Sequence, residues 1–337
     1  MRIVKRSVLL CGLLLALAVP KPFFFARAQQ GQKSPGGYQV VRGWPRLPEG
    51  YVLGQVSGVA VDSHNHVFVF HRTTRSSRNL PKLEGPIPEA TVLCFDGDSG
   101  ALVAQWGQGL FRTPHGITVD HDNNIWLTER ELHQVYKFSH DGKLLLTLGE
   151  KGVPGADGLH FGGPSGVAVA ADGSIYVSDG YDNSRVVKFS ATGEFLFDWG
   201  KKGSGPGEFN LVHAVALGAQ GRVYIADRGN ARIQVFTSEG KFLAEWKSEA
   251  LGRPWALATG ADGFLYVVDG GDLKLTPPDR AHILKVDPTG KVLAQWSSFG
   301  NYDGQIYWGH DIAVGRDGAV YVGDILGQRV QKFVPER

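Results

Sequence analysis

A degenerate repeat runs through the chain from residue 56 onward. Each copy opens with a small residue or Pro, any residue, Gly or Ala, and a hydrophobic residue, and then passes through a turn into an aromatic segment. The second residues of the six opening segments are spaced 58, 50, 48, 42 and 55 residues apart: Ser57, His115, Ser165, His213, Trp255 and His310. Short strands and turns at this period indicate propeller blades. We therefore expect an all-β fold, a six-bladed β-propeller.

The third copy shows how one blade would be built. Its four strands are expected at 166–170, 175–177, 185–189 and 194–199, with Asp172-Gly173 and Thr192-Gly193 as turns. The sixth copy ends at 330–333 without a fourth strand, whereas 38–44 is similar to the outer strands of the other copies. We expect this N-terminal strand to complete the last blade, because closure of the ring hides exposed strand edges.

An acidic residue and an arginine recur five or six residues apart in three copies: Asp179 with Arg185, Asp227 with Arg232, and Asp324 with Arg329. The repeat that carries them resembles the NHL repeat. We interpret these pairs as ion pairs that join the second and third strands of a blade, rather than as catalytic groups.

The N-terminus predicts export. A basic segment containing Arg2, Lys5 and Arg6 precedes the apolar run 7–19, and Ala26-Arg27-Ala28 offers a cleavage site. We predict a signal peptide at 1–28, a propeller domain at 29–337, and a secreted or periplasmic protein; the alternative is an uncleaved anchor. Cleavage would remove Cys11 and leave Cys94 without a disulfide partner, so Cys94 is expected to be a buried apolar residue.

The charge balance argues against some partners. The net charge of the 337-residue chain is only +2, with no long basic or acidic run. Neither nucleic acid nor an anionic membrane surface is therefore an expected partner. We expect a monomer without stable membrane insertion once the signal is cleaved.

Histidine occupies the second position of copies two, four and six, as His115, His213 and His310. The first strand of each blade lines the central channel, so these side chains would lie about 120° apart on one level. Three neutral nitrogen ligands with an open position are typical of catalytic zinc. The alternative is three unrelated channel histidines that hold water. The other histidines, His64, His66 and His71 among them, fall outside this register and are expected at the surface or in hairpins.

A second cation site is suggested at the same end of the first strands. The carbonyls of Val59 and Ile117, with the Asp311 carboxylate, have the oxygen ligands that calcium prefers. Asp311 has two alternative roles, capping its strand or orienting His310.

Longer segments resemble one family. They are Gly54–Asp62 followed by Phe70-His71-Arg72, Pro114-His115-Gly116, Val177–Tyr181 with Asn183-Ser184-Arg185, Ala226-Asp227-Arg228, and His310-Asp311-Ile312. These segments resemble peptidyl-α-hydroxyglycine α-amidating lyases over nearly the whole mature chain. The resemblance implies catalytic zinc on His115, His213 and His310, structural calcium at Val59, Ile117 and Asp311, and catalytic roles for Tyr181, Arg72 and Arg228. The implied substrate is a small peptidyl or N-acyl α-hydroxyglycine, cleaved to an amide and glyoxylate.

The positions of these residues agree with such chemistry. Arg72, Arg130 and Arg228 each follow a second strand, and Tyr181 lies near the matching point of blade three. Tyr181 would act as general base, and Arg72 and Arg228 would hold the substrate carboxylate. Packing or ion-pair roles are the alternatives for these three residues. Arg130 is expected to be structural.

The chain departs from the family pattern in three respects. Its cysteines do not supply the two disulfides of the family, it has Trp308 where the family has a methionine, and the copper monooxygenase domain often fused to the lyase is not expected within these 337 residues. The alternatives are therefore a non-catalytic NHL propeller that binds a protein or glycan, or a propeller lyase or hydrolase of another small substrate.

Overall fold

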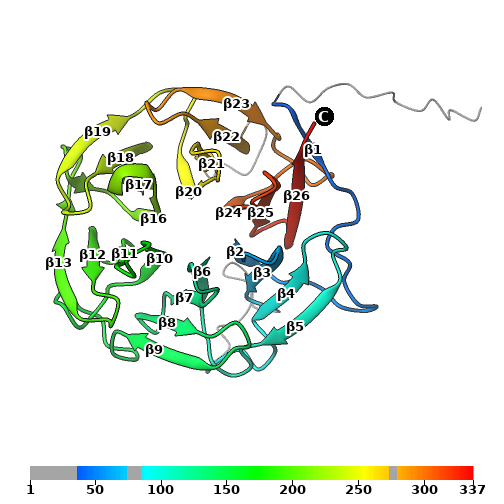
Figure 1. Cartoon of the computed structure of the whole chain (residues 1–337), viewed down its shortest axis with the longest axis horizontal. Helices are drawn as coiled ribbons and strands as arrows, with labels where there is room; N and C mark the ends of the chain where they lie inside the picture. Colours follow the sequence, from blue (N-terminus) through cyan, green and yellow to red (C-terminus); the bar gives the residue numbers. More distant parts are fainter. Residues whose placement is uncertain (1–35, 74–84, 273–278, 337) are drawn as a thin grey trace, which may run out of the picture. The chain divides into compact units, whose positions relative to one another are not determined.

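A computed structural model describes residues 36–73, 85–272 and 279–336. These residues form six four-stranded antiparallel sheets arranged as blades around an axis (Figure 1). The prediction of an all-β, six-bladed propeller is confirmed. The described helices are two 3-10 turns, η1 (Ala219–Gly221) and η2 (Arg228–Asn230), and neither has the length or hydropathy to cross a membrane. The predicted signal peptide, 1–28, lies outside the described residues.

Each blade runs from an inner strand at the axis to an outer strand at the rim. Blade one consists of β2 (Val56–Val61), β3 (His66–His71), β4 (Val92–Asp96) and β5 (Leu102–Trp106), and blade two of β6 (Pro114–Val119), β7 (Ile125–Glu129), β8 (Gln134–Phe138) and β9 (Leu144–Leu148). Blade three consists of β10 (Pro164–Val169), β11 (Ile175–Asp179), β12 (Arg185–Phe189) and β13 (Phe195–Trp199), and blade four of β16 (Val212–Leu217), β17 (Val223–Asp227), β18 (Arg232–Phe236) and β19 (Phe242–Trp246). Blade five consists of β20 (Pro254–Thr259), β21 (Leu265–Asp269), β22 (His282–Val286) and β23 (Val292–Trp296), and blade six of β24 (Gly309–Val314), β25 (Val320–Asp324), β26 (Arg329–Pro335) and the N-terminal strand β1 (Tyr38–Val40). A short parallel pair, β14 (Lys201–Lys202) and β15 (Glu208–Phe209), lies between blades three and four.

The ring closes as predicted, because β1 pairs antiparallel with β26 and Gln39 lies opposite Val334. The strand is shorter than the expected 38–44. It ends before Gly43, whose φ of 72° is left-handed. Trp44 then packs into the core, with its ring 4.9 Å from that of Tyr321. The closing segment is therefore held both by its strand pairing and by an aromatic anchor.

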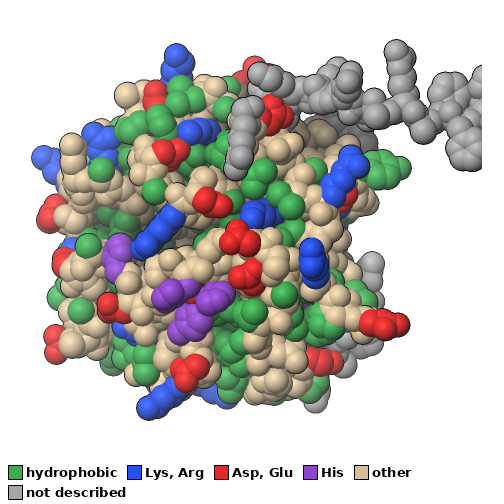
Figure 2. Space-filling model, turned by 45° about the vertical axis from the view of Figure 1, so that its right-hand side comes forward, with side chains coloured by type: hydrophobic (Ala, Val, Ile, Leu, Met, Phe, Trp, Pro, Cys, Tyr) green, Lys and Arg blue, Asp and Glu red, His purple; other side chains and the backbone are tan. Residues whose placement is uncertain are grey.

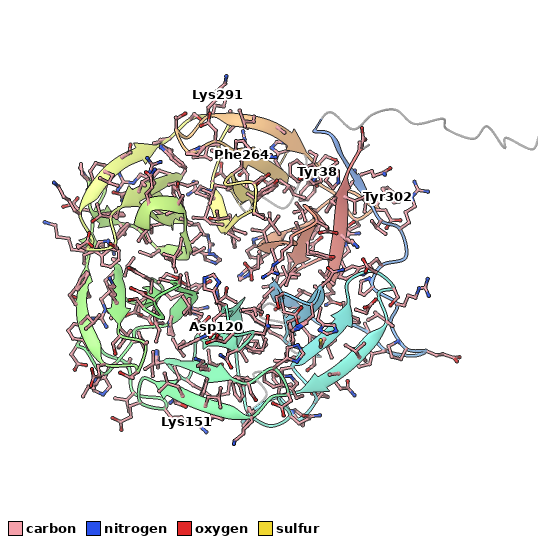
Figure 3. The ribbon with its side chains drawn as sticks, viewed as in Figure 1. Tyr38, Asp120, Lys151, Phe264, Lys291 and Tyr302 are labelled. Carbon is pink, nitrogen blue, oxygen red and sulfur yellow. The ribbon has the colours of Figure 1, made fainter. Side chains whose placement is uncertain are left out.

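The core lies between neighbouring blades. Second strands such as β7 and β17 are buried along their whole length, because another blade covers each of their faces. Phe70 of blade one and Phe111 at the entry to blade two meet edge to face with their centroids 5.0 Å apart. Lys151 and Lys291 lie at the rim, and Asp120 lies nearer the axis (Figure 3). This packing fixes the positions of the inner strands.

A one-residue register shift occurs in each inner strand at the second position of the repeat. In β16, Val212 pairs with Asp227 and Ala214 with Ala226, so that His213 is the extra residue. The same shift accompanies Ser57, His115, Ser165, Trp255 and His310. A β-bulge redirects the side chain of its extra residue. The bulges therefore place one side chain per blade at the channel.

The predicted ion pairs are confirmed, with Nε–Oδ2 distances of 2.9 Å for Arg185–Asp179, 2.7 Å for Arg232–Asp227 and 3.2 Å for Arg329–Asp324. Each carboxylate also accepts backbone N–H groups from the loop that leads into its inner strand. Asp227 accepts from Asn210 at 2.8 Å, and Asp324 accepts from Trp308 at 2.8 Å. The pairs of blades four and six thus hold the loops that precede His213 and His310.

Candidate active site

The three histidines of the repeat register meet at the axis. Their ring centroids lie 5.0 Å apart for His115 and His213, 4.7 Å for His115 and His310, and 4.9 Å for His213 and His310. All three side chains are buried, and each offers a ring nitrogen within 4.8 Å of the other two. The alternate blades β6, β16 and β24 therefore bring three imidazoles together as one nearly equilateral group.

Each imidazole is oriented by the next blade. Nδ1 of His115 lies 2.6 Å from the carbonyl oxygen of Ser165, and Nδ1 of His213 lies 2.6 Å from that of Trp255. Nδ1 of His310 lies 2.7 Å from the carbonyl oxygen of Ser57. Because a carbonyl only accepts, the Nδ1 atoms are the protonated ones, and the Nε2 atoms carry lone pairs. Such fixing of the remote nitrogen is typical of metal-ligating histidine.

Burial also keeps these rings neutral. It lowers the pKa of His310 to about 3, with the nearby positive charge of Arg72 acting in the same direction. The pKa values of His115 and His213 likewise lie well below the ordinary range, chiefly because of burial. Three neutral imidazoles with unprotonated Nε2 atoms are a donor set that can hold a transition-metal ion.

Tyr181 lies directly beside this group. Its hydroxyl oxygen is 2.8 Å from Nε2 of His115 and 3.3 Å from Nε2 of His213. The residue follows β11 and is only partly buried. The position suits proton exchange with a molecule bound against the imidazoles.

Arg72 and Arg228 carry positive charge around the tyrosine. Arg72 is buried, and it donates from Nε to the Pro114 carbonyl at 3.0 Å and from Nη1 to Oε1 of Gln55 at 3.3 Å. Arg228 lies over the Trp255 ring, with its guanidinium carbon 3.4 Å from the ring centroid. Burial lowers the pKa of each guanidinium to about 10, so both remain charged at neutral pH. The pair can bind an anionic group.

Arg130 and Trp308 make contacts beside the histidines that the sequence analysis does not predict. Arg130, expected to be structural, lies over the Tyr181 ring with its guanidinium carbon 3.8 Å from the centroid. Trp308 contacts Trp255 edge to face at 5.1 Å. Since Trp255 in turn lies 5.2 Å from the His213 ring, the two tryptophans form an aromatic wall beside the histidines.

The candidate calcium residues also lie together. Oδ2 of Asp311 accepts from the Val59 N–H at 3.0 Å, and Oδ1 accepts from the Ile312 N–H at 2.9 Å. Burial raises the pKa of the Asp311 carboxyl to about 8 in spite of these two bonds. A cation beside the carboxylate would favour its charged form. Val59, Ile117 and Asp311 all line a channel cavity of about 320 Å³, whose lining also includes the three histidines.

The remaining histidines follow the expectation in part. His71 is instead buried at the end of β3, where its Nδ1 accepts from the Gly54 N–H at 3.2 Å. His64 and His66 lie in the β2–β3 hairpin as expected, but they meet His140 of the next blade around Asp62. The repeat register does not predict this second group, because His140 belongs to an outer hairpin.

Comparisons with known proteins agree with the fold. A family model described as "6-bladed beta-propeller" matches residues 155–252. Among solved structures, a streptogramin B lyase superposes with a TM-score of 0.59 at 16% identity, over 88% of this chain and 97% of that one. At this identity the likeness concerns the fold alone.

Curated relatives are closer in sequence. Peptidyl-glycine alpha-amidating monooxygenase B of Xenopus laevis is 37% identical over 87% of this chain, which spans only 35% of that protein. Peptidyl-alpha-hydroxyglycine alpha-amidating lyase 2 of Drosophila melanogaster is 34% identical over 88% of this chain and 75% of its own length. NHL repeat-containing protein 3 of Homo sapiens is 33% identical over 88% of this chain and 84% of its own length. The chain belongs to the peptidyl-α-hydroxyglycine α-amidating lyase family of NHL-repeat propellers.

Proposed function

We propose that the protein is a zinc-dependent lyase that cleaves peptidyl or N-acyl α-hydroxyglycine into an amide and glyoxylate. The observation that supports this best is the meeting of Tyr181 with two of the three anchored imidazoles, at 2.8 Å and 3.3 Å. A general base beside a metal donor set is what proton removal from a substrate hydroxyl requires.

The donor set fits zinc. His115, His213 and His310 would hold the ion through Nε2, because their Nδ1 atoms are engaged by backbone carbonyls. Bound zinc supplies a Lewis acid that makes a nearby hydroxyl more acidic. The burial that keeps the imidazoles neutral keeps them competent as ligands.

The remaining roles fall to side chains of this chain. Arg72 and Arg228 bind the substrate carboxylate through charge-assisted hydrogen bonds and so orient the carbinol carbon. Tyr181 takes the hydroxyl proton and returns a proton to the departing amide nitrogen. As the carbinol oxygen becomes the aldehyde of glyoxylate, the C–N bond breaks and its electron pair stays on nitrogen. Atoms and charge balance without an oxidant or water.

Calcium is proposed as a structural ion at Val59, Ile117 and Asp311. Support comes from the Asp311 carboxyl, whose pKa is raised by burial. A neighbouring cation would lower this pKa and keep the carboxylate charged. Channel water would complete the coordination that calcium requires. An ion here would join blades six, one and two below the histidines.

The test combines metal content with product analysis. Protein never exposed to a chelator is assayed for zinc and then incubated with an α-hydroxyglycine peptide, and the amide and glyoxylate are measured. We expect both products in equal amounts. Bound zinc without glyoxylate would indicate a different substrate, and absence of any transition metal would refute the site.

The second candidate is a non-catalytic NHL propeller. Two observations favour it: the 33% identity to NHL repeat-containing protein 3, and the bulk of Trp308 beside Trp255. A binding module has no requirement for three imidazoles at one register or for Tyr181 against them, so we prefer the enzyme. The same assay separates the two, because only the lyase releases glyoxylate.

We further propose an exported monomer that acts on a small peptide or N-acyl substrate. The modest net charge of +2 supports neither nucleic acid nor a membrane surface as partner.

A further inference from the structure

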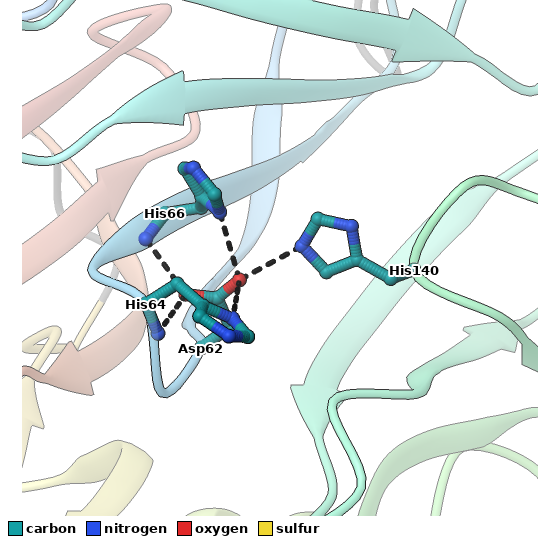
Figure 4. A group of neighbouring side chains, drawn as sticks. All are labelled: Asp62, His64, His66 and His140. Atoms are coloured by element: carbon teal, nitrogen blue, oxygen red, sulfur yellow. Dashed lines mark hydrogen bonds and ion pairs between the residues drawn. The ribbon is translucent and has the colours of Figure 1, made fainter.

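A second group of metal-ligating side chains lies outside the candidate active site. Asp62 and His64 lie in the turn between β2 and β3, His66 is the first residue of β3, and His140 lies in the turn between β8 and β9 of the next blade (Figure 4). One ligand atom of each lies within 4.8 Å of all the others. We propose that this group is a binding site for a divalent transition-metal ion such as Zn²⁺, which joins blades one and two.

The nitrogen atoms converge on a single carboxylate oxygen. Oδ2 of Asp62 lies 2.8 Å from Nε2 of His140, 3.0 Å from Nδ1 of His66 and 3.7 Å from Nδ1 of His64. A tetrahedral zinc ion with bonds of about 2.0–2.1 Å places its ligand atoms about 3.3 Å apart. The three distances lie within about half an ångström of that spacing, so the imidazole nitrogens already stand close to the separation from the carboxylate oxygen that a bound ion requires.

The carboxylate is prepared for such a role. Oδ1 of Asp62 already accepts the His64 and His66 backbone N–H groups, at 2.8 Å and 2.7 Å. Oδ2 has about two lone-pair positions, and three imidazole nitrogens face it. A metal ion resolves this mismatch, because it binds the oxygen and all three nitrogens at once.

The group is reachable from solvent although its centre is enclosed. The exposed fractions are 64% for the His64 side chain, 30% for His66 and 42% for His140, against none for Asp62. Histidine side chains gather on the face of the molecule shown in Figure 2. The Phe68 ring meets His140 edge to face at 5.2 Å and restricts its orientation. An ion can therefore enter from solvent into a partly built site.

The site is separate from the channel histidines. Ser57, the channel residue of blade one, lies at the start of β2, whereas Asp62 follows its other end. The proposal does not depend on the lyase activity, and we expect changes in this group to leave turnover intact.

The test counts zinc on the full chain. Protein stripped with a chelator is dialysed against a zinc buffer that holds a fixed free Zn²⁺ concentration, and bound zinc is measured by mass spectrometry of the metal. We compare the wild type with a double variant, His64→Gln with His140→Gln. The matched control is His121→Gln, an exposed histidine of a neighbouring turn that lies outside the group.

We expect the double variant to bind one zinc ion fewer per chain than the wild type, and His121→Gln to bind as many. We also expect zinc to raise the urea midpoint of the wild type more than that of the double variant. Equal zinc in the wild type and the double variant would overturn the proposal, as would an equal loss in His121→Gln. If the double variant does not fold, His64→Gln alone removes one of the four ligands at an exposed position, and we expect it to need a higher free Zn²⁺ concentration for the same occupancy. An unchanged zinc requirement of this single variant would also overturn the proposal. If the channel histidines bind no zinc, all of these proteins lack lyase activity, but the wild type still binds one zinc ion more per chain than the double variant. Failure of the proposed function is therefore distinguishable from failure of this proposal.

Discussion

At the residue scale, the site depends on a few atoms whose positions are set by backbone groups. The Nδ1 atoms of His115, His213 and His310 each meet a carbonyl of the next blade, and the Tyr181 hydroxyl meets two of the Nε2 atoms. The division of roles between ligands and base follows from these contacts, and it can be tested one side chain at a time.

Removal of the tyrosine hydroxyl should separate metal binding from turnover. Tyr181→Phe keeps the ring over which Arg130 lies and removes only the oxygen. We expect unchanged zinc content and a loss of turnover of about 10²-fold or more, the usual contribution of a general base. Metal analysis and a glyoxylate assay measure the two effects. Turnover equal to that of the wild type would remove Tyr181 from the mechanism.

Arg228 should act mainly through substrate binding. Arg228→Lys keeps the charge but loses the planar group that lies 3.4 Å from the Trp255 ring centroid. We expect KM to rise by about tenfold, which corresponds to the loss of one charge-assisted hydrogen bond. Steady-state kinetics measure this rise. Arg222→Lys, on the exposed β16–β17 turn, is the control and should leave KM unchanged.

At the scale of the element, the blade hairpins hold the loops that carry the site. Each buried carboxylate joins its arginine to the loop before an inner strand, as Asp227 joins Arg232 to the Asn210 N–H. The sequence predicted three of these pairs from their spacing. It missed Asp269 with Arg280, because a longer connection places the two residues eleven apart.

The pair in blade four should contribute strongly to stability. Asp227→Asn removes the buried partner of Arg232 and leaves this arginine paired only with the partly exposed Glu245 carboxylate. We expect a loss of about 2 kcal/mol in the free energy of unfolding. Lys201→Ala breaks a surface pair with Glu208 and should cost less than about 1 kcal/mol. Urea unfolding measures both values. Equal values for the two variants would contradict the role assigned to the hairpin pairs.

The closing strand should be anchored through its first residue. The Tyr38 ring stacks on Trp296 at 4.2 Å, and its hydroxyl lies 3.1 Å from that of Tyr266. We expect Tyr38→Ala to cost about 3 kcal/mol, the usual loss for a large buried aromatic. The urea midpoint, with Val52→Ala at a 75% exposed position as control, measures the cost. A midpoint as high as that of the control would show that β1 adds little to closure.

At the scale of the whole molecule, the repeat explains what the sequence predicts and what it does not. Equivalent residues of each blade face the axis, so the shared register of His115, His213 and His310 is sufficient to predict that they lie together. Contacts between non-equivalent positions do not follow from the period. The group around Asp62 is of this second kind, because its residues do not share one position of the repeat. Arg130 and Tyr181 follow equivalent strands of neighbouring blades, so the period places them near each other, but it does not predict that one stacks on the other.

The central claim is that turnover depends on an ion held by this ring. The most direct measurement is glyoxylate release from an α-hydroxyglycine peptide while zinc is titrated into chelator-stripped protein. We predict that activity returns with zinc in the wild type, and that folded His213→Ala stays inactive at every zinc concentration. Full activity of the stripped protein, or of His213→Ala, would contradict the claim.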